Sequence, residues 1–408
     1  MSSALRTETI KALEQLPKGT DVVVGIPSYE NESTVAFVVQ QAYQGIEQYF
    51  GGRGCILNSD GGSQDSTQKV FMETETGDIP KLSFEYEGLP GKGSALRSIM
   101  EAAHILESRC LVLLDSDLRS VRPHWVDLLA RPILDGTASY ITPFYQRHKY
   151  DGTITNHICY PLTCMLYNRK VRQPIGGDFG VSASMIERYI QKPEVVWETD
   201  VARFGIDIWM TTVALCEAEL PIAQAALGAK IHDVKDPGKH LGPMFSQVVG
   251  TLFTMMEVYQ SIWKANEDAL EDVPIMGTIP EVELEPLVVD LDNLRSRSRT
   301  LFRQQKDFLL THFDPAASQR WKSVEESGMI ASADWLDLVF RFASLYRNHE
   351  LRDGLIQSLV PIYYARVASF VEQTQDMDHD QAEAVVEEQA RRARSMKKQL
   401  KEIWEMNC

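Results

Sequence analysis

The sequence predicts an α/β protein in which a doubly wound, mostly parallel sheet of the Rossmann-like type is followed by a C-terminal α-helical domain. Three observations support this prediction. Apolar runs alternate with segments of helical periodicity over the first 120 residues, as in parallel sheets with right-handed crossovers. Each run ends in a polar or glycine-bearing turn. Beyond residue 290 the apolar residues recur at helical spacing, which indicates helices.

Four apolar runs are expected to form the first strands of the sheet. They are DVVVGIPSY (21–29), GCILNSDGG (54–62), LSFEYEG (82–88) and CLVLLDSD (110–117). The segments 31–50, 63–75 and 91–107 carry helical spacing and complete three β-α units. Ligands of an open α/β sheet bind at the carboxyl ends of its strands. The turns after these runs are therefore the first place to look for a site.

The length of 408 residues and the hydrophobic content of 44% predict two or three domains with sizeable cores. We expect a first domain over residues 1–265. The segment 266–290 is acidic, contains three prolines and lacks a long period, so it is interpreted as a linker. Residues 291–408 are expected to form the helical domain.

Composition excludes several classes of function. The formal net charge of −16 argues against binding nucleic acid through its phosphates. No apolar run approaches the ~20 residues of a membrane span, and residues 1–19 contain no hydrophobic signal core. The six cysteines are scattered without CxxC spacing, which disfavours a disulfide framework or a zinc site. The expected location is the cytoplasm.

Two aspartates, Asp115 and Asp117, follow the fourth apolar run in the stretch LVLLDSDLRS. Neighbouring carboxylates repel each other, and a divalent cation or ligand hydroxyls relieve that repulsion. A bare DxD also occurs in many surface loops, so a solvated pair stays an alternative. The turns IPSYENEST, NSDGGSQDST and LPGKGSAL offer backbone N–H groups to phosphate or ribose oxygens. Lys92 lies between two glycines at a helix start, although GKG is not the full phosphate-loop pattern.

Seven motifs in order resemble one family of enzymes. The motifs DVVVGIPSYENESTV, NSDGGSQDST, GKGSAL, LLDSDL, PIGGDFGV, RFGIDIW and LGAKIHD lie within residues 20–250. They resemble GT-A-fold retaining glycosyltransferases of the glucosyl-3-phosphoglycerate synthase and mannosylglycerate synthase type. The resemblance implies a GT-A fold and transfer of glucose or mannose from a nucleoside diphosphate sugar, UDP-glucose or GDP-mannose, to a small hydroxy-acid acceptor.

The resemblance also implies which residues bind the donor and a divalent metal. Asp117 and His232 would hold Mg²⁺ or Mn²⁺, whereas a lone histidine without the motif order would be a structural one. Asn31 stands where the family has its first glutamate, so either Glu30 or Glu32 would serve the ribose hydroxyls. The nucleotide-sugar residues implied are Pro27, Ser28, Tyr29, Glu30, Glu32, Ser59, Asp60, Lys92, Asp115, Ser116, Gly176 and Gly177.

The acceptor side is implied by the later motifs. Asp178 would accept hydrogen bonds from the transferred sugar, and Asp207 would orient an acceptor hydroxyl or act as a base; a helix cap or an ion pair is the alternative for Asp207. Thr153 stands where phosphoglycerate-using relatives have an arginine, and a threonine provides no bidentate fork. Either nearby cations compensate or the acceptor is unphosphorylated. The predicted acceptor-binding residues are Thr153, Thr155 and Lys235.

The sequence near the C-terminus predicts one more amphipathic helix. Within residues 382–406, the apolar residues approach coiled-coil spacing: Val386, Ala390, Ala393, Leu400 and Ile403. This helix either docks within the chain or pairs two subunits, and a solvated packing helix stays an alternative because the pattern covers fewer than four heptads. We expect the protein to be a homodimer.

A haloacid dehalogenase-type phosphatase is disfavoured because three β-α units precede the DSD motif. A non-catalytic, sugar-nucleotide-binding regulator acting through the helical domain stays the alternative function.

Overall fold

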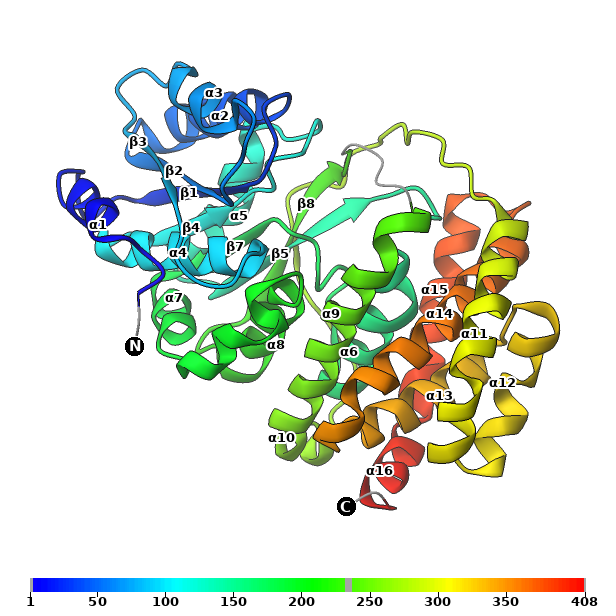
Figure 1. Ribbon diagram of the computed structural model, residues 1–408. Coiled ribbons are helices and arrows are strands. Elements are labelled where there is room, and N and C mark those ends of the chain that lie inside the picture. The colour runs from blue at the N-terminus through cyan, green and yellow to red at the C-terminus, as the bar shows by residue number, and fades with distance from the viewer. Residues whose placement is uncertain (1–2, 232–236, 407–408) are drawn as a thin grey trace. The chain divides into compact units, whose positions relative to one another are not determined.

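The computed structural model describes residues 3–231 and 237–406, with side chains described for 3–231 and 242–406 (Figure 1). The chain divides into two compact units, each made of separate segments. Unit 1 comprises residues 1–146, 172–234 and 273–283, and unit 2 comprises residues 147–171, 235–272 and 284–408. The predicted domains, with boundaries at residues 265 and 290, are continuous segments, whereas these units are not. Whether the predicted domains fold independently stays a prediction.

Unit 1 is built on one eight-stranded sheet with the order β10-β8-β5-β7-β4-β1-β2-β3. Strand β7 runs antiparallel to both of its neighbours, and the other adjacent strands are parallel. The predicted mostly parallel sheet is confirmed. Its strands are β1 (Val22–Ser28), β2 (Gly54–Asp60), β3 (Lys81–Glu85), β4 (Cys110–Leu113), β5 (Tyr140–Gln146), β7 (Phe179–Ser182), β8 (Ile222–Ala229) and β10 (Ile275–Met276).

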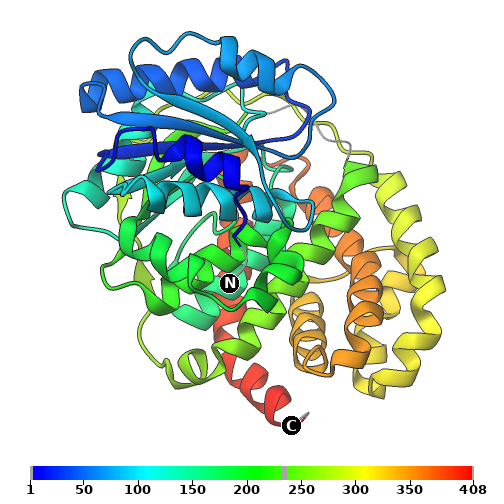
Figure 2. The same ribbon diagram turned by 60° about the vertical axis from the view of Figure 1, so that its left-hand side comes forward.

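Helices cover both faces of this sheet, as a doubly wound fold requires. Figure 2 shows the blue helix α2 running along one face of the strands. The helices that pack with the sheet and with one another are α2 (Val35–Phe50), α3 (Thr67–Glu73) and α5 (Pro123–Leu134) on one face, and α4 (Lys92–Ile105), α7 (Ala183–Ile190) and α8 (Ile206–Glu217) on the other. α1 (Thr7–Leu13) contacts α4.

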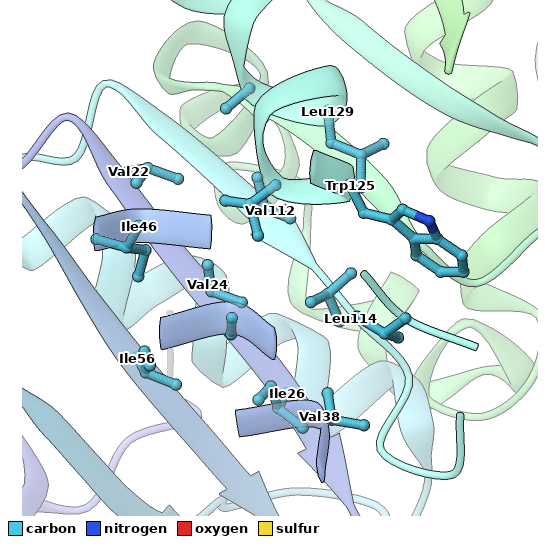
Figure 3. Close-up of a cluster of buried hydrophobic side chains, with 14 of the residues drawn as sticks. Val22, Val24, Ile26, Val38, Ile46, Ile56, Val112, Leu114, Trp125 and Leu129 are labelled. Atoms are coloured by element: carbon cyan, nitrogen blue, oxygen red, sulfur yellow. The ribbon is translucent and has the colours of Figure 1, made fainter. Parts of the chain in front are cut away.

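Alternation along β1 divides its side chains between the two faces. Val22, Val24 and Ile26 are completely buried and belong to the core that α2 and α5 close (Figure 3). Gly25 points to α4, where an added Cβ would lie 2.3 Å from a methyl group of Ile99. Glycine at this position therefore lets α4 pack closely on the sheet, and α4 carries Lys92 to the carboxyl edge of the strands.

Helix α2 begins four residues later than the sequence predicts. We expect a helix from residue 31, but it begins at Val35. The backbone N–H groups of Thr34 and Val35 both bond to the Asn31 carbonyl, while the Asn31 side chain accepts hydrogen bonds from elsewhere. Short polar side chains that bond locally compete with helix formation. Residues 29–34 therefore form a turn at the strand end.

Unit 2 is mainly helical, which confirms the predicted helical C-terminal region. Its last six α-helices, yellow to red in Figure 1, are α11 (Leu291–His312), α12 (Pro315–Ser327), α13 (Ser332–Leu345), α14 (Arg352–Thr374), α15 (His379–Ser395) and α16 (Lys397–Met406). Its earlier elements are the π-helix η1 (Thr155–Cys159), α6 (Tyr160–Tyr167), α9 (Pro237–Val258), α10 (Gln260–Ala265) and the paired short strands β6 (Arg169–Lys170) and β9 (Glu271–Asp272).

The helix predicted over residues 382–406 is divided between α15 and α16, and the five apolar residues of its predicted spacing are buried inside unit 2. Val386 and Ala390 of α15 pack with Tyr160, Cys164 and Phe370. The other three of these residues, on α15 and α16, are buried as well. This arrangement matches docking within the chain, and the expected homodimer stays a prediction. Among the helices that the structure describes, none combines the length and apolar character needed to cross a membrane.

Candidate functional site

The carboxyl ends of the parallel strands meet at one edge of the unit 1 sheet. From β1 the order continues through β2 and β3 on one side and through β4 on the other, and ligands of doubly wound sheets bind where the order reverses in this way. The turn after β1 begins at Tyr29, and the turn after β4 contains Asp115 and Asp117. Because β7 is antiparallel to β4, with Phe179 opposite Leu113, the residues just before β7 lie at the same edge.

Asp60, the last residue of β2, shapes the turn that follows. Its side chain is buried, and its carboxylate accepts hydrogen bonds from the Ser28 hydroxyl at 2.7 Å and from the Ser63 N–H and hydroxyl at 2.7 and 2.8 Å. Ser59 is also buried, with its hydroxyl 2.8 Å from that of Ser98. These predicted nucleotide-binding residues therefore hold the turn from inside the protein.

The turn after β1 has an uncommon backbone conformation. Glu30 has a φ of +54°, a left-handed value that few residues other than glycine adopt, and its N–H donates to the Ser63 hydroxyl at 2.8 Å. The Glu32 carboxylate accepts a hydrogen bond of 2.9 Å from the N–H of Ser66. Within the described residues the Glu30 carboxylate has no such partner. The geometry favours Glu30 over Glu32 as a ligand for hydroxyls, beside the exposed ring of Tyr29.

Asn31 joins this turn to the one after β4. Its side-chain oxygen accepts hydrogen bonds from the Ser116 hydroxyl at 2.8 Å and from the Tyr29 N–H at 2.9 Å. The Thr34 hydroxyl donates to the Ser116 carbonyl at 2.8 Å. Pro27 lies inside β1, just before the turn. The structure thus brings the predicted residues of the first and fourth strand ends together.

Asp115 is the centre of a cluster of charged side chains. Its Oδ1 lies 2.9 Å from Lys92 Nζ, and its Oδ2 lies 2.8 Å from Lys230 Nζ. Lys92 Nζ is also 3.2 Å from the Asp207 carboxylate, and Lys230 Nζ is 3.1 Å from the Asp178 carboxylate. Two ammonium groups and three carboxylates therefore alternate along the edge. For Asp207, the structure shows the ion pair that the sequence left as an alternative.

Lys230 and Tyr145 belong to this cluster, although the sequence argument does not identify them. Lys230 follows β8, and its ammonium also donates to the Gly176 carbonyl at 2.7 Å. It lies 5.3 Å from the centre of the Tyr145 ring, and the Tyr145 hydroxyl donates to the Asp178 carboxylate. A single cation at the end of an apolar strand, two residues before His232, is the signal that points to Lys230. Tyr145 resembles any core residue of a strand.

Glycines are required where the chain passes this cluster. Gly177 has a φ of +91°, and a Cβ there would lie 2.1 Å from Asp115 Oδ2 and 3.0 Å from Lys230 Nζ. A Cβ on Gly176 would lie 2.1 Å from the Pro143 ring. The Gly177 backbone therefore packs directly on the charged side chains, and Gly176 packs on Pro143. Contact of these glycines with a transferred sugar stays a prediction.

Burial and pairing move the pKa values in opposite directions. Burial raises the pKa of Asp178 to about 6, against the effect of Lys230. Burial raises the pKa of Asp207 as well, and Lys92 opposes it. Burial would also raise the pKa of Asp115, but Lys230 and Lys92 outweigh it and hold that pKa far below its usual range. Asp178 is completely enclosed, with Oδ1 accepting the Asp115 N–H at 2.9 Å. Neighbouring carboxylates whose pKa values are shifted in opposite directions are typical of functional sites.

The predicted metal ligands are only partly described. Asp117 lies in the turn after β4 and is half-buried, whereas His232 lies outside the described residues. Among the side chains that the structure describes, in residues 3–231 and 242–406, no three of His, Cys, Asp or Glu group as a metal site. Mg²⁺ is commonly held by one or two carboxylates together with substrate phosphates, and the half-buried Asp117 carboxylate at the strand ends would fit that donor set.

Two of the three predicted acceptor residues, Thr153 and Thr155, are described by the structure. Thr153 and Thr155 are buried in unit 2, and the Thr153 hydroxyl lies 2.6 Å from that of Tyr363 on α14. Lys235 lies outside the described residues. The structure therefore leaves the acceptor residues as predictions from the resemblance.

No protein-family model matches the sequence, and no curated protein matches it. Solved structures that resemble the chain include three of glucosyl-3-phosphoglycerate synthase from Mycobacterium tuberculosis. One, with Mn²⁺, UDP and phosphoglyceric acid, is 23% identical over 62% of this chain and 84% of that chain, at a TM-score of 0.47. A second, with Mn²⁺, UDP-glucose and phosphoglyceric acid, is 24% identical over 63% and 86%, at 0.48. A third, with Mg²⁺ and UDP, is 23% identical over 62% and 84%, at 0.46. A likeness of this degree carries no argument about what this chain binds or does.

Proposed function

We propose that the protein is a metal-dependent glycosyltransferase that moves glucose or mannose from a nucleoside diphosphate sugar to a small hydroxy acid. The observation that carries this proposal is the cluster of Lys92, Asp115, Lys230, Asp178 and Asp207 at the point where the strand order of the sheet reverses. The order of the seven sequence motifs supports it independently.

The residues divide into two halves of a donor site. The turns that contain Tyr29 and Glu30 would receive the nucleoside, with Glu30 accepting the ribose hydroxyls. Asp115, Gly177 and Lys92 would face the sugar and the diphosphate. The buried side chains of Ser59, Asp60 and Asp178 would act through the backbone and the charges that they hold in place.

Asp117 and His232 would hold Mg²⁺ or Mn²⁺ at the end of β4. A divalent cation held there would supply charge neutralisation for a leaving nucleoside diphosphate. Lys92, at the start of α4 and 15% exposed, would bring a second positive charge to the diphosphate. Retention of configuration is proposed from the resemblance alone. The Asp178 side chain is completely buried, so we do not assign it the role of a covalent nucleophile, and attack by the acceptor on the same face of the sugar is the proposed route.

The acceptor is proposed to be glycerate or 3-phosphoglycerate. Thr153 supplies no guanidinium for an acceptor phosphate, which favours glycerate. Asp207 would orient the acceptor hydroxyl, since it lies in the first turn of α8 and is paired with Lys92.

A transfer assay tests this function. UDP-glucose and GDP-mannose are offered as donors with D-glycerate and 3-phosphoglycerate as acceptors, in Mg²⁺ or Mn²⁺. We expect an acceptor-dependent product whose formation falls at least about a hundredfold in Asp117→Ala. Asp127→Ala, which removes a carboxylate paired with Arg131 on α5, is the matched control and should leave the rate unchanged.

Each outcome has a definite reading. A product with the donor's anomeric configuration, determined by NMR, supports retention, and the preferred acceptor decides between the two acids. Donor binding without turnover on either acceptor would favour the non-catalytic regulator instead. A chain that binds neither donor in the presence of metal would contradict both functions.

A further inference from the structure

Two hydrogen-bond networks organise the carboxyl edge of the unit 1 sheet. The first joins the turns after β1 and β2 through Ser28, Asp60, Ser63 and the Glu30 N–H. It reaches the turn after β4 through the bond between Ser116 and the Asn31 side chain, described above. This network contains the residues proposed for the nucleoside and we call it the nucleoside network.

The second network is the charged cluster, in which Lys230, just after β8, contacts two other segments: the turn after β4 and the loop before β7. Its ammonium contacts Asp115 after β4, the Gly176 carbonyl before β7, and Asp178 at 2.8, 2.7 and 3.1 Å. An ammonium group has three N–H donors, and all three meet an acceptor here. We call this set the sugar network.

The two lysines of the sugar network differ in what they can do. The Lys230 side chain is 6% exposed and its donors are satisfied inside the protein. Lys92 is more exposed, at 15%, and is shared between Asp115 and Asp207. Lys92 is thus placed to meet an incoming phosphate, whereas Lys230 is placed to hold protein groups in position.

Lys230 holds in position the groups that surround Gly177, which are the Asp115 and Asp178 carboxylates and the Gly176 carbonyl. The Gly177 backbone passes so close to Asp115 Oδ2 and to Lys230 Nζ that no side chain fits between them. Removing the ammonium would leave the Asp115 and Asp178 carboxylates facing each other without this cation, and like charges in a buried site repel. The backbone between residues 176 and 178 would then lose the contact that fixes it.

We propose that Lys230 is a positioning residue for the sugar half of the donor site, and that it sets the affinity for the hexose rather than for the nucleotide. This inference rests on the proposed function. The nucleoside network does not use Lys230 among the described contacts, so the nucleotide half should stay intact when Lys230 is replaced.

Binding calorimetry with Mn²⁺ present separates the two halves. UDP and UDP-glucose form one pair of probes, GDP and GDP-mannose the other, and the pair that the wild-type protein binds is used. In Lys230→Met we expect the affinity for the sugar nucleotide to fall at least about tenfold, while the affinity for the nucleoside diphosphate changes less than about twofold.

Three further variants define the result. Lys92→Met should weaken the binding of both probes, and Asn31→Ala should do so through the nucleoside network. Lys192→Met removes another half-buried lysine of unit 1, paired with Glu217, and should change neither affinity. If Lys230→Met does not fold, Lys230→Arg, which keeps the charge, should retain nucleotide affinity and lose part of the sugar-nucleotide affinity.

An equal loss for both probes in the Lys230 variant, or no loss for either, would overturn the proposal. Wild-type protein that binds none of the four compounds would overturn the proposed function itself. The two failures are therefore distinguishable.

Discussion

Each unit of this molecule contains a carboxylate held by two cationic side chains, and the two carboxylates differ in their surroundings. In unit 2, Asp337 of α13 is completely enclosed, with Oδ2 2.6 Å from Arg320 on α12 and 2.8 Å from Arg341. In unit 1, Asp115 is held by Lys92 and Lys230 but is 19% exposed.

The comparison shows that ion pairing alone does not identify a site. Asp337 joins regular helices, and Gln399 of α16 also donates to it, so its charges tie helical elements together. Asp115 lies in a turn at the open end of a sheet, against a glycine that leaves no space for a side chain. Under the proposed function, its position at the strand ends and its partial exposure would distinguish Asp115 as a binding carboxylate from the structural Asp337.

The largest expected effect is on the stability of the protein and concerns the buried carboxylate of Asp337. Asp337→Ala should lower the free energy of unfolding by on the order of 3 kcal/mol, because Arg320 and Arg341 lose their ion pairs, and Gln399 its hydrogen bond, with one completely enclosed carboxylate. Arg320 keeps Asp334 and Arg341 keeps Asp314, which limits the loss. Urea denaturation measures this loss. At a temperature where the variant is folded, its affinity for the nucleotide should equal that of the wild type. A weaker affinity would contradict a purely structural role for Asp337.

A second prediction concerns pH and Asp178. Its raised pKa, about 6, means that folding favours the protonated carboxyl, so this contribution to stability is present below the ordinary value of about 3.9 and is lost as the pH rises through 6. The groups that face it are Lys230, Asp115 and Tyr145. Asp178→Asn should therefore match the wild type only near or below the ordinary pKa of about 3.9, and exceed its free energy of unfolding by roughly 2–3 kcal/mol at pH 8, with about half of that difference already present near pH 5.

Unfolding curves at several pH values measure this difference. A variant that is less stable than the wild type at pH 8 would show that the ion pair with Lys230 outweighs the burial of the charge.

The binding member should respond in the opposite way to Asp337. Asp115→Asn should weaken UDP-glucose binding at least about tenfold, which corresponds to ~1.4 kcal/mol, with a smaller change in the free energy of unfolding. Stability is spared because Lys92 keeps Asp207 and Lys230 keeps Asp178 as partners. Calorimetry and denaturation on the same preparation test this. Loss of stability without loss of binding would place Asp115 with the structural carboxylates.

The smallest predicted effect distinguishes two neighbouring glutamates. Glu30→Gln should reduce UDP affinity by roughly fivefold, as expected for one hydrogen bond to a charged acceptor, whereas Glu32→Gln should change it little because that side chain already bonds to Ser66. The reverse order would reassign the ribose contact to Glu32.

Much of the fold could be predicted from the sequence because its signals are local. The strands that contain Val24, Ile56 and Val112 are apolar runs bounded by polar turns, and the carboxyl ends of parallel strands necessarily meet at one edge. Asp115 and Lys92 were therefore predictable as neighbours from the turns in which they lie.

Other features depend on partners that the sequence does not reveal. Lys230 lies within the motif LGAKIHD, but its role depends on acceptors contributed by the turn after β4 and by the loop before β7. Residues 147–171 fold with unit 2 rather than with the sheet that surrounds them in sequence. An apolar segment has the same pattern whichever element buries it, so this assignment needed the structure.

The most direct test of the central claim is the metal dependence of nucleotide binding at the end of β4. Calorimetry of UDP, or GDP if that base is preferred, is performed with Mn²⁺ and after its removal by EDTA, on the wild type and on Asp117→Ala. We predict binding to the wild type that weakens strongly without Mn²⁺, and weak, metal-independent binding to the variant. Equal binding in all four conditions would contradict a metal-nucleotide site at this edge of the sheet.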